Sequence, residues 1–541
     1  MMQADRQTRR LLWLLSLASS LLMSLPWLVP HLGFVALFGF VPLLCAERIA
    51  TLSGVRWFWR WHYASFVLWN ACTTFWVCNA TVGGGIFAVL ANALQMSLVF
   101  GLFRLSRKRF GGVLPYVLLA TVWIAWEHLY FDAQISWPWL VLGGAFARST
   151  RAVQWYCVTG TLGGSLWIWA CNLALFGLMV ALSDGRLFRW NAKARWAALL
   201  GSVIIVVAPF LVSERLYRSF DPAEGTPLEV VVAQPDFDPY EKFESLPQKE
   251  QNRILLGLFS EALGPDSTQR CLLLAPETFT GDVWLQDGEV VSSPTLAAFR
   301  QFMERYPGCD LLFGASAHTM HASGPAPSLL ARRYGKGWVT SHNSALMTGA
   351  DRPTEVFHKS KLVVGVEMTP WPRLFVPVDN KLGGVMGRNE GQREVSCLHL
   401  EKAAEQVPLG CAVCYESVYG AYCTEYVRHG AKLLTVITND AWWGDTPGYR
   451  QHLSYARLRA IELRRDVARC ANTGISAFID ARGDVLSQTP WWTRTTLRGT
   501  VRLRDGETLF VRYGDVTGRI CTLLAALLLA ALLVRFLVRR P

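Results

Sequence analysis

The sequence is organised around the stretch Leu409-Gly410-Cys411-Ala412-Val413-Cys414-Tyr415-Glu416-Ser417. The apolar run 407–413 predicts a buried strand that ends at Cys414, and the residues after it predict a turn that leads into a helix. A cysteine at such a turn lies beside free backbone N–H groups and the positive end of a helix dipole. Both favour the nucleophilic thiolate over the thiol. The alternative interpretation of Cys414 is a buried cysteine that serves only as a small apolar side chain.

The composition is that of a membrane protein. The chain has 541 residues, of which 52% are hydrophobic and 23 are tryptophan, which is too apolar for an ordinary soluble enzyme. A net charge of +12 would suit a nucleic-acid partner. Many basic residues, however, lie in short clusters between apolar runs, as they do beside membrane spans, so no nucleic-acid partner is expected. The 13 cysteines are an odd number, and their count reveals no disulfide framework.

Eight apolar segments approach the roughly 20 residues that a helix needs to cross a bilayer. They are 11–29, 33–49, 57–77, 84–103, 113–131, 160–182, 196–212 and 520–538. The first could be a signal peptide, because arginines precede it. Its apolar run is long, no small-residue cleavage site is obvious and another apolar segment follows at once, so we expect a retained span.

The basic clusters predict the topology. With eight spans, the clusters at 6–10, 48–60, 104–109, 186–195 and 535–540 all lie on one side of the membrane. The positive-inside rule makes that side the cytoplasm and places both termini there. The predicted organisation is seven transmembrane helices in 1–215, an extracytoplasmic domain in 222–518, and an eighth helix with a cytoplasmic tail in 519–541.

The long section 222–518 alternates short β-rich runs with amphipathic stretches. The predicted strands are 228–233, 271–275, 310–313, 342–347, 407–413, 433–438 and 475–479, and the predicted helices include 248–263, 295–306 and 449–470. This alternation predicts an α/β domain with a buried sheet.

Three predicted strand ends carry reactive side chains, as expected in such sheets. They are Glu277, Lys359 and Cys414. In acyl transfer a carboxylate takes the thiol proton, the thiolate attacks a carbonyl, and an ammonium group stabilises the oxyanion. Taken singly, Glu277 could instead cap a helix and Lys359 could be a solvated loop charge.

The motifs at these positions resemble the nitrilase (carbon–nitrogen hydrolase) superfamily. They are Pro-Glu-Thr at 276–278, Lys359 followed by Glu367, Cys-Tyr-Glu at 414–416 and Asn-Asp-Ala-Trp-Trp-Gly at 439–444. With eight spans around that domain, the chain resembles the apolipoprotein N-acyltransferase family over essentially its whole length. The resemblance implies a polytopic α-helical membrane bundle plus a nitrilase-type α-β-β-α sandwich.

The resemblance also implies a Glu–Lys–Cys triad without a metal or another cofactor. Glu277 is then the general base, Lys359 the oxyanion stabiliser and Cys414 the nucleophile. Supporting or substrate-binding positions of the family match Glu367, Tyr415, Glu416, Trp442, Asn439 and Phe243, of which the last stands where tryptophan is common. His358 before the lysine and His128 after Glu127 also depart from the family pattern, and they leave lipid and acceptor preference open.

The implied reaction is ping-pong acyl transfer. Cys414 takes an acyl chain from a membrane phospholipid, typically phosphatidylethanolamine, as a thioester. It then passes the chain to the α-amino group of the diacylglyceryl-cysteine of an apolipoprotein. The implied setting is the bacterial inner membrane with a periplasmic catalytic domain, and we expect a monomer.

The segment 368–391 is rich in Pro and Gly and contains Trp371 and Phe375. It predicts a long loop without regular structure, which is either a lid that excludes water or a plain exposed loop.

Several rival functions remain at this stage. The pair Cys411 and Cys414 could form a thioredoxin-type redox motif, although Cys411 falls inside the predicted strand. A zinc site lacks a second ligand pair at the right spacing. A membrane-tethered amidase shares the triad, and a transporter with an outer domain is disfavoured because the spans contain few charges and no obvious repeat.

Overall fold

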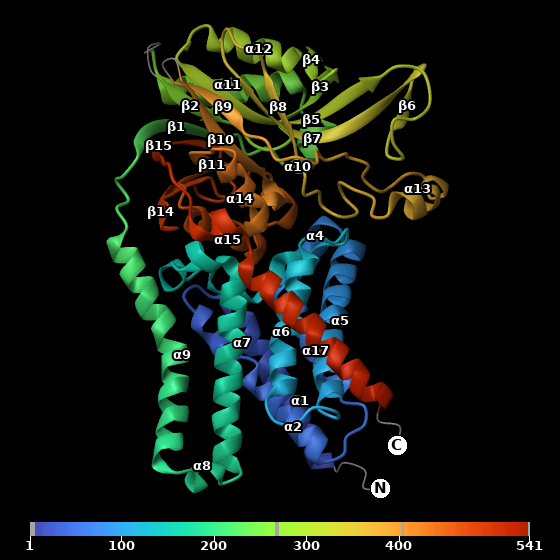
Figure 1. Ribbon diagram of the computed structural model, residues 1–541. Coiled ribbons are helices and arrows are strands. Elements are labelled where there is room, and N and C mark those ends of the chain that lie inside the picture. Colours follow the sequence, from blue (N-terminus) through green and yellow to red (C-terminus); the bar gives the residue numbers. More distant parts are fainter. Residues whose placement is uncertain (1–5, 266–269, 403–404, 539–541) are drawn as a thin grey trace. The chain divides into compact units, whose positions relative to one another are not determined.

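The computed structural model describes residues 6–265, 270–402 and 405–538 of the chain, apart from the side chains of Phe243 and Lys402 (Figure 1). The chain forms two compact units. The helical unit comprises Met1–Phe220, Thr446–Gln451 and Tyr513–Pro541, and the sheet unit comprises Asp221–Asp445 and His452–Arg512.

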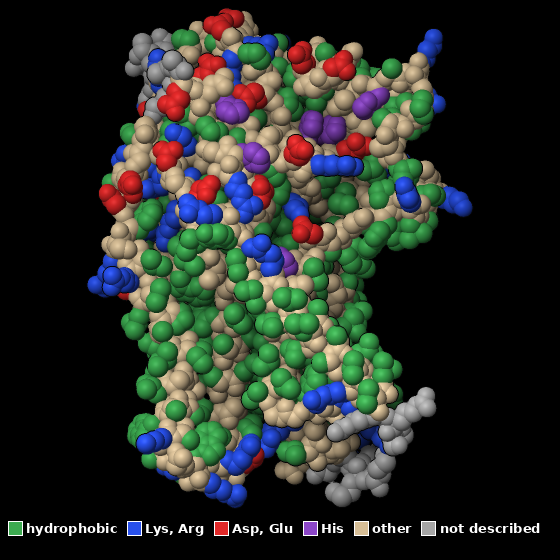
Figure 2. Space-filling model, viewed as in Figure 1, with side chains coloured by type: hydrophobic (Ala, Val, Ile, Leu, Met, Phe, Trp, Pro, Cys, Tyr) green, Lys and Arg blue, Asp and Glu red, His purple; other side chains and the backbone are tan. Residues whose placement is uncertain are grey.

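The helical unit consists of long apolar helices joined by short turns. Its elements are α1 (Arg6–Leu28), η1 (Gly33–Leu37), α2 (Val41–Leu52), α3 (Trp59–Thr74), α4 (Val77–Ala80), α5 (Val82–Ser106), α6 (Leu114–Tyr130), η2 (Pro138–Leu140), η3 (Leu142–Phe146), η4 (Thr150–Ala152), α7 (Tyr156–Ser183), α8 (Arg186–Arg189), α9 (Ala192–Ser219) and α17 (Val516–Val538). Apolar side chains cover these helices, and Lys and Arg side chains gather at the end where α8 lies (Figure 2).

Within the described residues, six segments are long and apolar enough to cross a membrane. They are Arg6–Leu28, Gly33–Leu52, Val82–Ser106, Tyr156–Ser183, Ala192–Ser219 and Val516–Val538. The predicted spans 57–77 and 113–131 correspond to α3 and α6, which have only 16 and 17 residues. At about 1.5 Å per residue, each is shorter than the roughly 30 Å of a hydrocarbon core. The structure therefore supports six of the eight predicted spans.

Glu127 lies inside the helical unit with an exposed fraction of 1%. Its Oε1 accepts hydrogen bonds from Trp123 Nε1 at 3.0 Å and from the backbone N–H of Leu142 at 2.8 Å. Leu142 begins η3, whose backbone is not α-helical. Glu127 thus satisfies a free backbone N–H of an irregular segment and does not face water.

The sheet unit contains a nine-stranded sheet and a six-stranded sheet. The first has the order β15-β1-β2-β5-β3-β4, with β7 paired to β5, β6 and β8. Its strands are β1 (Thr226–Gln234), β2 (Cys271–Leu274), β3 (Thr280–Gln286), β4 (Glu289–Ser292), β5 (Cys309–His321), β6 (Arg332–Tyr334), β7 (Gly337–Thr348), β8 (Glu355–His358) and β15 (Thr495–Leu503). The second sheet has the order β14-β13-β12-β11-β10-β9. Its strands are β9 (Leu398–Lys402), β10 (Glu405–Val413), β11 (Leu433–Thr438), β12 (Val467–Ala471), β13 (Ala477–Ile479) and β14 (Val485–Gln488).

The two sheets pack against each other inside the sheet unit. Between them, the thiol of Cys470 on β12 contacts the carbonyl oxygens of Ala233 at 3.4 Å and Leu274 at 3.5 Å. Helices α11 (Gln248–Leu263) and α12 (Pro294–Met303) bury their apolar faces with the first sheet in one hydrophobic cluster. Helix α14 (Gly420–Arg428) belongs to the second sheet, since its Tyr426 hydroxyl donates to Cys411 O on β10 at 2.8 Å. The predicted α/β domain is confirmed.

Two local predictions were wrong. The helix predicted over 449–470 is α15 (Pro447–Leu463), which ends where Arg464 adopts a φ of 50°, and the fully buried residues after it form β12. The segment 368–391 is not a structureless loop, because α13 (Pro372–Lys381) lies within it. Pro372 favours a helix start there, since its fixed φ suits the first turn. The remaining short helices are α10 (Pro239–Glu244), η5 (Cys414–Val418), η6 (Asp440–Trp443) and α16 (Leu509–Tyr513).

Candidate active site

Cys414 is the first residue after β10 and opens η5. Its φ of 54° lies in the left-handed region, which costs a non-glycine residue about 1–3 kcal/mol and is found where surrounding contacts enforce it. Here the contacts act on its carbonyl oxygen. Ser417 Oγ donates to this oxygen at 2.8 Å, and His452 Nε2 lies 3.0 Å from it. The side chain itself is 9% exposed.

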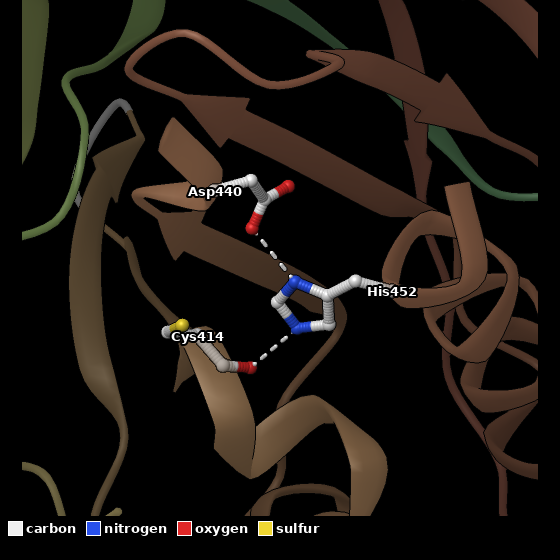
Figure 3. A group of neighbouring side chains, drawn as sticks. All are labelled: Cys414, Asp440 and His452. Carbon is white, nitrogen blue, oxygen red and sulfur yellow. Dashed lines mark hydrogen bonds and ion pairs between the residues drawn. The ribbon is translucent and has the colours of Figure 1, made fainter. Parts of the chain in front are cut away.

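A buried polar network surrounds His452. Its Nδ1 lies 2.9 Å from Asp440 Oδ1, whose other oxygen accepts from Arg469 Nη2 at 2.6 Å (Figure 3). The imidazole faces the backbone carbonyl of Cys414, while the sulfur points elsewhere (Figure 3). Cys414, Asp440 and His452 have potential metal-ligand atoms within 4.8 Å of one another. Because Arg469 already neutralises the carboxylate, the group serves as a hydrogen-bond network that fixes the Cys414 backbone.

Glu277 and Lys359 meet directly. Lys359 Nζ lies 3.2 Å from Glu277 Oε1 and 2.9 Å from Glu367 Oε2. Asn343 Nδ2 donates to both carboxylates, at 2.8 Å to Glu277 and 2.6 Å to Glu367. The second oxygen of Glu277 accepts from the backbone N–H of Asn439 at 3.1 Å. These contacts fix the Glu277 carboxylate and the Lys359 ammonium group at the ends of β2, β8 and β11.

Charges of the three predicted triad members act on one another. Burial is the largest influence on the Lys359 pKa and lowers it. The negative charges of Glu277 and Glu367 outweigh burial and hold that pKa well above its usual range. Burial and then Glu277 raise the pKa of the Cys414 thiol well above its usual range, while Lys359 lowers it. These pKa shifts favour the charged ammonium group of Lys359 and the protonated thiol of Cys414.

The predicted effect of the turn on the Cys414 thiol pKa is outweighed by burial. Cys414 does lie at a strand-to-helix turn, but η5 is a single five-residue 3₁₀ segment with a small dipole. Burial of the sulfur and the adjacent carboxylate dominate its pKa. A thiol with a raised pKa needs a base to become a nucleophile, and Glu277 is the carboxylate that raises the Cys414 pKa most strongly.

Glu416 links the segment of Cys414 to the segment of Lys359. One carboxylate oxygen accepts from the backbone N–H groups of Ser360 at 2.7 Å and Lys361 at 3.1 Å, and the other accepts from Val413 N at 2.8 Å. The residue is fully buried, and burial raises its pKa to about 7. Glu416 thus joins the segment after Lys359 to the strand end before Cys414.

Two family models match this chain, one within the helical unit and one within residues 269–509, which contain most of the sheet unit. The family model described as "Apolipoprotein N-acyltransferase N-terminal domain" matches residues 19–174, and "Carbon-nitrogen hydrolase" matches residues 269–509. Apolipoprotein N-acyltransferase of Chlorobaculum tepidum is 28% identical over 96% of both chains, and that of Geobacter metallireducens is 26% identical over 96% of this chain and 94% of its own. The chain belongs to the apolipoprotein N-acyltransferase family.

Membership makes this chain an N-acyltransferase of the nitrilase superfamily. Among solved structures, Nit3 of Saccharomyces cerevisiae, described as a member of branch 10 of that superfamily, is 13% identical. The structural match covers 55% of this chain and 97% of the Nit3 chain, with a TM-score of 0.36.

The other residues predicted from the apolipoprotein N-acyltransferase resemblance have different positions. Tyr415 is buried and its ring lies 5.2 Å from that of Tyr419, while Trp442 is 37% exposed with its ring 5.9 Å from that of Tyr240. Asn439 lies beside Glu277, as described above. Phe243 belongs to α10, and its side chain lies outside the described part of the chain.

Cys411 does not have the setting of a redox partner for Cys414. It lies inside β10 with an exposed fraction of 1%, and burial raises the pKa of its thiol to about 12. Redox-active cysteines have lowered pKa values in partly exposed sites.

Sequence reasoning named neither His452 nor Lys242 as site residues. Lys242 is buried in α10, and its Nζ donates to Thr278 O at 2.5 Å, directly after Glu277. Burial lowers the pKa of Lys242 to about 8. No local pattern marks these residues, because their partners are 36 and 38 positions away.

Proposed function

We propose that this N-acyltransferase transfers a fatty acyl chain from a membrane phospholipid to the N-terminal α-amino group of the diacylglyceryl-cysteine of an apolipoprotein. The observation that carries this proposal is the buried arrangement of Glu277, Lys359 and Cys414 within a chain that also has apolar membrane-length helices. A lipid-embedded chain gives the nucleophile access to acyl donors that a soluble amidase would not meet.

In the first half-reaction, Glu277 accepts the Cys414 thiol proton as the sulfur attacks the ester carbonyl carbon of the phospholipid. The ammonium group of Lys359 stabilises the oxyanion that forms. Collapse of this intermediate breaks the ester C–O bond, and the lysophospholipid alkoxide leaves with the proton returned by Glu277. Cys414 then carries the acyl chain as a thioester.

In the second half-reaction, the α-amino group of the acceptor attacks the thioester carbonyl. Glu277 accepts a proton from the attacking nitrogen, Lys359 again stabilises the oxyanion, and the C–S bond breaks. The thiolate of Cys414 recovers its proton from Glu277. One nucleophile thus serves both transfers, provided that water is kept from the thioester.

The proposed topology has eight spans, both termini in the cytoplasm and the sheet unit on the far side of a bacterial inner membrane. It is supported by basic residues that share one end of the helical unit. Arg48 pairs with Asp184 at 2.6 Å, Arg104 Nη2 donates to Val55 O at 2.6 Å, and Arg535 Nη1 donates to Arg109 O at 2.9 Å. Basic residues from distant parts of the sequence thus lie at the same end of the helical unit. By the positive-inside rule, this end is proposed to face the cytoplasm.

The test is intact-protein mass spectrometry of the full chain purified with phosphatidylethanolamine, compared with Cys414→Ala. We expect a mass increase of one acyl chain that hydroxylamine removes and that Cys414→Ala lacks. Addition of a diacylated lipopeptide should discharge the adduct and yield an N-acylated peptide. If the wild type gains no acyl mass but hydrolyses small amides, the membrane-tethered amidase is correct instead.

A further inference from the structure

Cys271 and Cys309 form a close pair far from the family's catalytic motifs. Cys271 begins β2, Cys309 begins β5, and the two residues are directly paired in neighbouring parallel strands. Parallel strands in register direct such side chains to the same face of the sheet. Both lie in the hydrophobic cluster beneath α11 and α12, each with an exposed fraction of 2%. Their sulfur atoms are 3.0 Å apart, and no disulfide bond joins them.

The backbone geometry suits a covalent bond. Neighbouring strands lie about 4.8 Å apart, and the Cα atoms of natural disulfides lie about 4.4–6.8 Å apart. The sulfur atoms would approach by only about 1 Å to reach a disulfide bond length. The strands therefore need no rearrangement.

A cavity beside the pair gives a reactant access to the sulfur of Cys309. A cavity of about 470 Å³ has Arg270, Cys309, Asp310 and Arg352 among its lining residues. The hydrogen bond from the Cys271 thiol is the main cause of a lowered pKa at Cys309. Because Cys309 lines this cavity, an incoming disulfide reaches its sulfur first, and Cys271 is the thiol that follows.

We propose that Cys271 and Cys309 are a modification site, oxidised to a disulfide that links β2 to β5. The co-reactant is the disulfide of a protein thiol oxidase. The Cys309 thiolate attacks one sulfur of that disulfide and releases the first thiolate of the oxidase. Cys271 then loses its proton and attacks the sulfur of Cys309, which releases the second. The two protons of the cysteines go to these thiolates, and the two electrons of the pair reduce the oxidase. This inference rests on the proposed extracytoplasmic location of the sheet unit, because thiols stay reduced in the cytosol.

The bond would anchor the strand that carries the catalytic base. β2 leads directly into Glu277, and Gly314 of β5 is so close that an added Cβ would meet Glu277 Cα at 2.5 Å. The cysteines are 38 residues apart, so the bond closes a long loop and restricts the unfolded chain. We expect the oxidised protein to unfold roughly 5 °C or more above the reduced protein.

The decisive experiment labels thiols in cells that express the full chain. Acid-quenched cells are denatured in N-ethylmaleimide, reduced, and then treated with iodoacetamide before peptide mass spectrometry. We expect Cys271 and Cys309 to carry the iodoacetamide label, and the buried control Cys423 to carry N-ethylmaleimide. Recovery of both paired cysteines with N-ethylmaleimide would overturn the proposal.

A second measurement tests the consequence on the purified protein. Reductant should lower the unfolding temperature of the wild type and of Cys423→Ala but leave Cys271→Ala/Cys309→Ala unchanged. An equal response in all three proteins would contradict a stabilising bond. Measuring the acylation of Cys414 in the same preparation distinguishes the proposed acyl transfer from the proposed disulfide. An acylated Cys414 with a reduced pair removes only this inference, whereas an oxidised pair without acylation removes only the proposed lipid chemistry.

Discussion

The Nε2 of His452 lies 3.0 Å from the carbonyl oxygen of Cys414, and no catalytic step requires it to touch the sulfur. Cys414 has a left-handed φ, and its carbonyl oxygen follows directly after the end of β10. The hydrogen bond from His452 restrains this carbonyl group. Asp440 holds the imidazole from the other side at 2.9 Å. We therefore expect His452 to position the backbone of Cys414, the proposed nucleophile.

The first prediction concerns His452. His452→Ala removes the donor and should slow thioester formation about 10- to 100-fold, as expected for a lost buried hydrogen bond of roughly 1–3 kcal/mol. His452→Gln keeps an amide donor and should recover part of the rate, with KM for phospholipid little changed. Rapid-quench measurement of acyl-enzyme formation checks this. Equal rates in both variants, with loss explained by unfolding alone, would contradict a positioning role.

The second prediction compares two glycines on the neighbouring strands β3 and β5 that differ in their surroundings. Gly314→Ala should abolish acylation, because a Cβ there would meet the backbone of Glu277 and Thr278 at 2.5 and 2.6 Å. Gly281→Ala is the matched control, since no heavy atom lies within 4 Å of its added Cβ. Acyl-enzyme yield and unfolding temperature should change for the first variant only. A fully active Gly314→Ala would show that the position of Glu277 is not critical.

The third prediction concerns the pH dependence of Cys414 alkylation. Burial and Glu277 raise the thiol pKa and Lys359 lowers it, so wild-type alkylation by iodoacetamide should still be rising at pH 9. Glu277→Gln removes a negative charge and should shift the profile to lower pH. Lys359→Met removes a positive charge and should shift it to higher pH. Alkylation rates from pH 6 to 10 test this, and shifts of the same sign in both variants would contradict it.

The fourth prediction concerns stability and Glu416. Its pKa of about 7 in the folded state lies above the ordinary 4.5, so the folded state binds this proton more tightly. The resulting stability is fully present below pH 4.5 and is lost as the pH rises through about 7, a change of roughly 3 kcal/mol. The Glu416→Gln side chain cannot titrate. Its amide NH₂ group would replace the oxygen that accepts from the Val413 N–H, so two donors would meet and the variant should be less stable than the wild type at every pH.

Chemical denaturation of the full chain in micelles checks this prediction at pH 5 and pH 8. The stability difference between wild type and Glu416→Gln should be larger at pH 5. A difference that grows toward pH 8 would mean that the carboxylate is the form preferred by the folded protein.

The sequence by itself determined the membrane character, the α/β domain and the strand ends that carry Glu277, Lys359 and Cys414. These features follow from local patterns, because apolar runs report burial and strand ends lie beside turns. It also predicted β11 and α11 to the residue, since turn signals and amphipathic periodicity bound each of them.

Tertiary structure alone decided the direction of the Cys414 pKa shift, the contacts of His452 and Lys242, and the proximity of Cys271 to Cys309. Each depends on partners 36 or more residues away, or on burial that no short window encodes. The sequence predicted a helix over the residues of β12 for the same reason. The pairing of β12 with β11 and β13 overrides the local preference for a helix. Local sequence therefore specifies which groups reach the sheet edge, and long-range packing sets their charge and geometry.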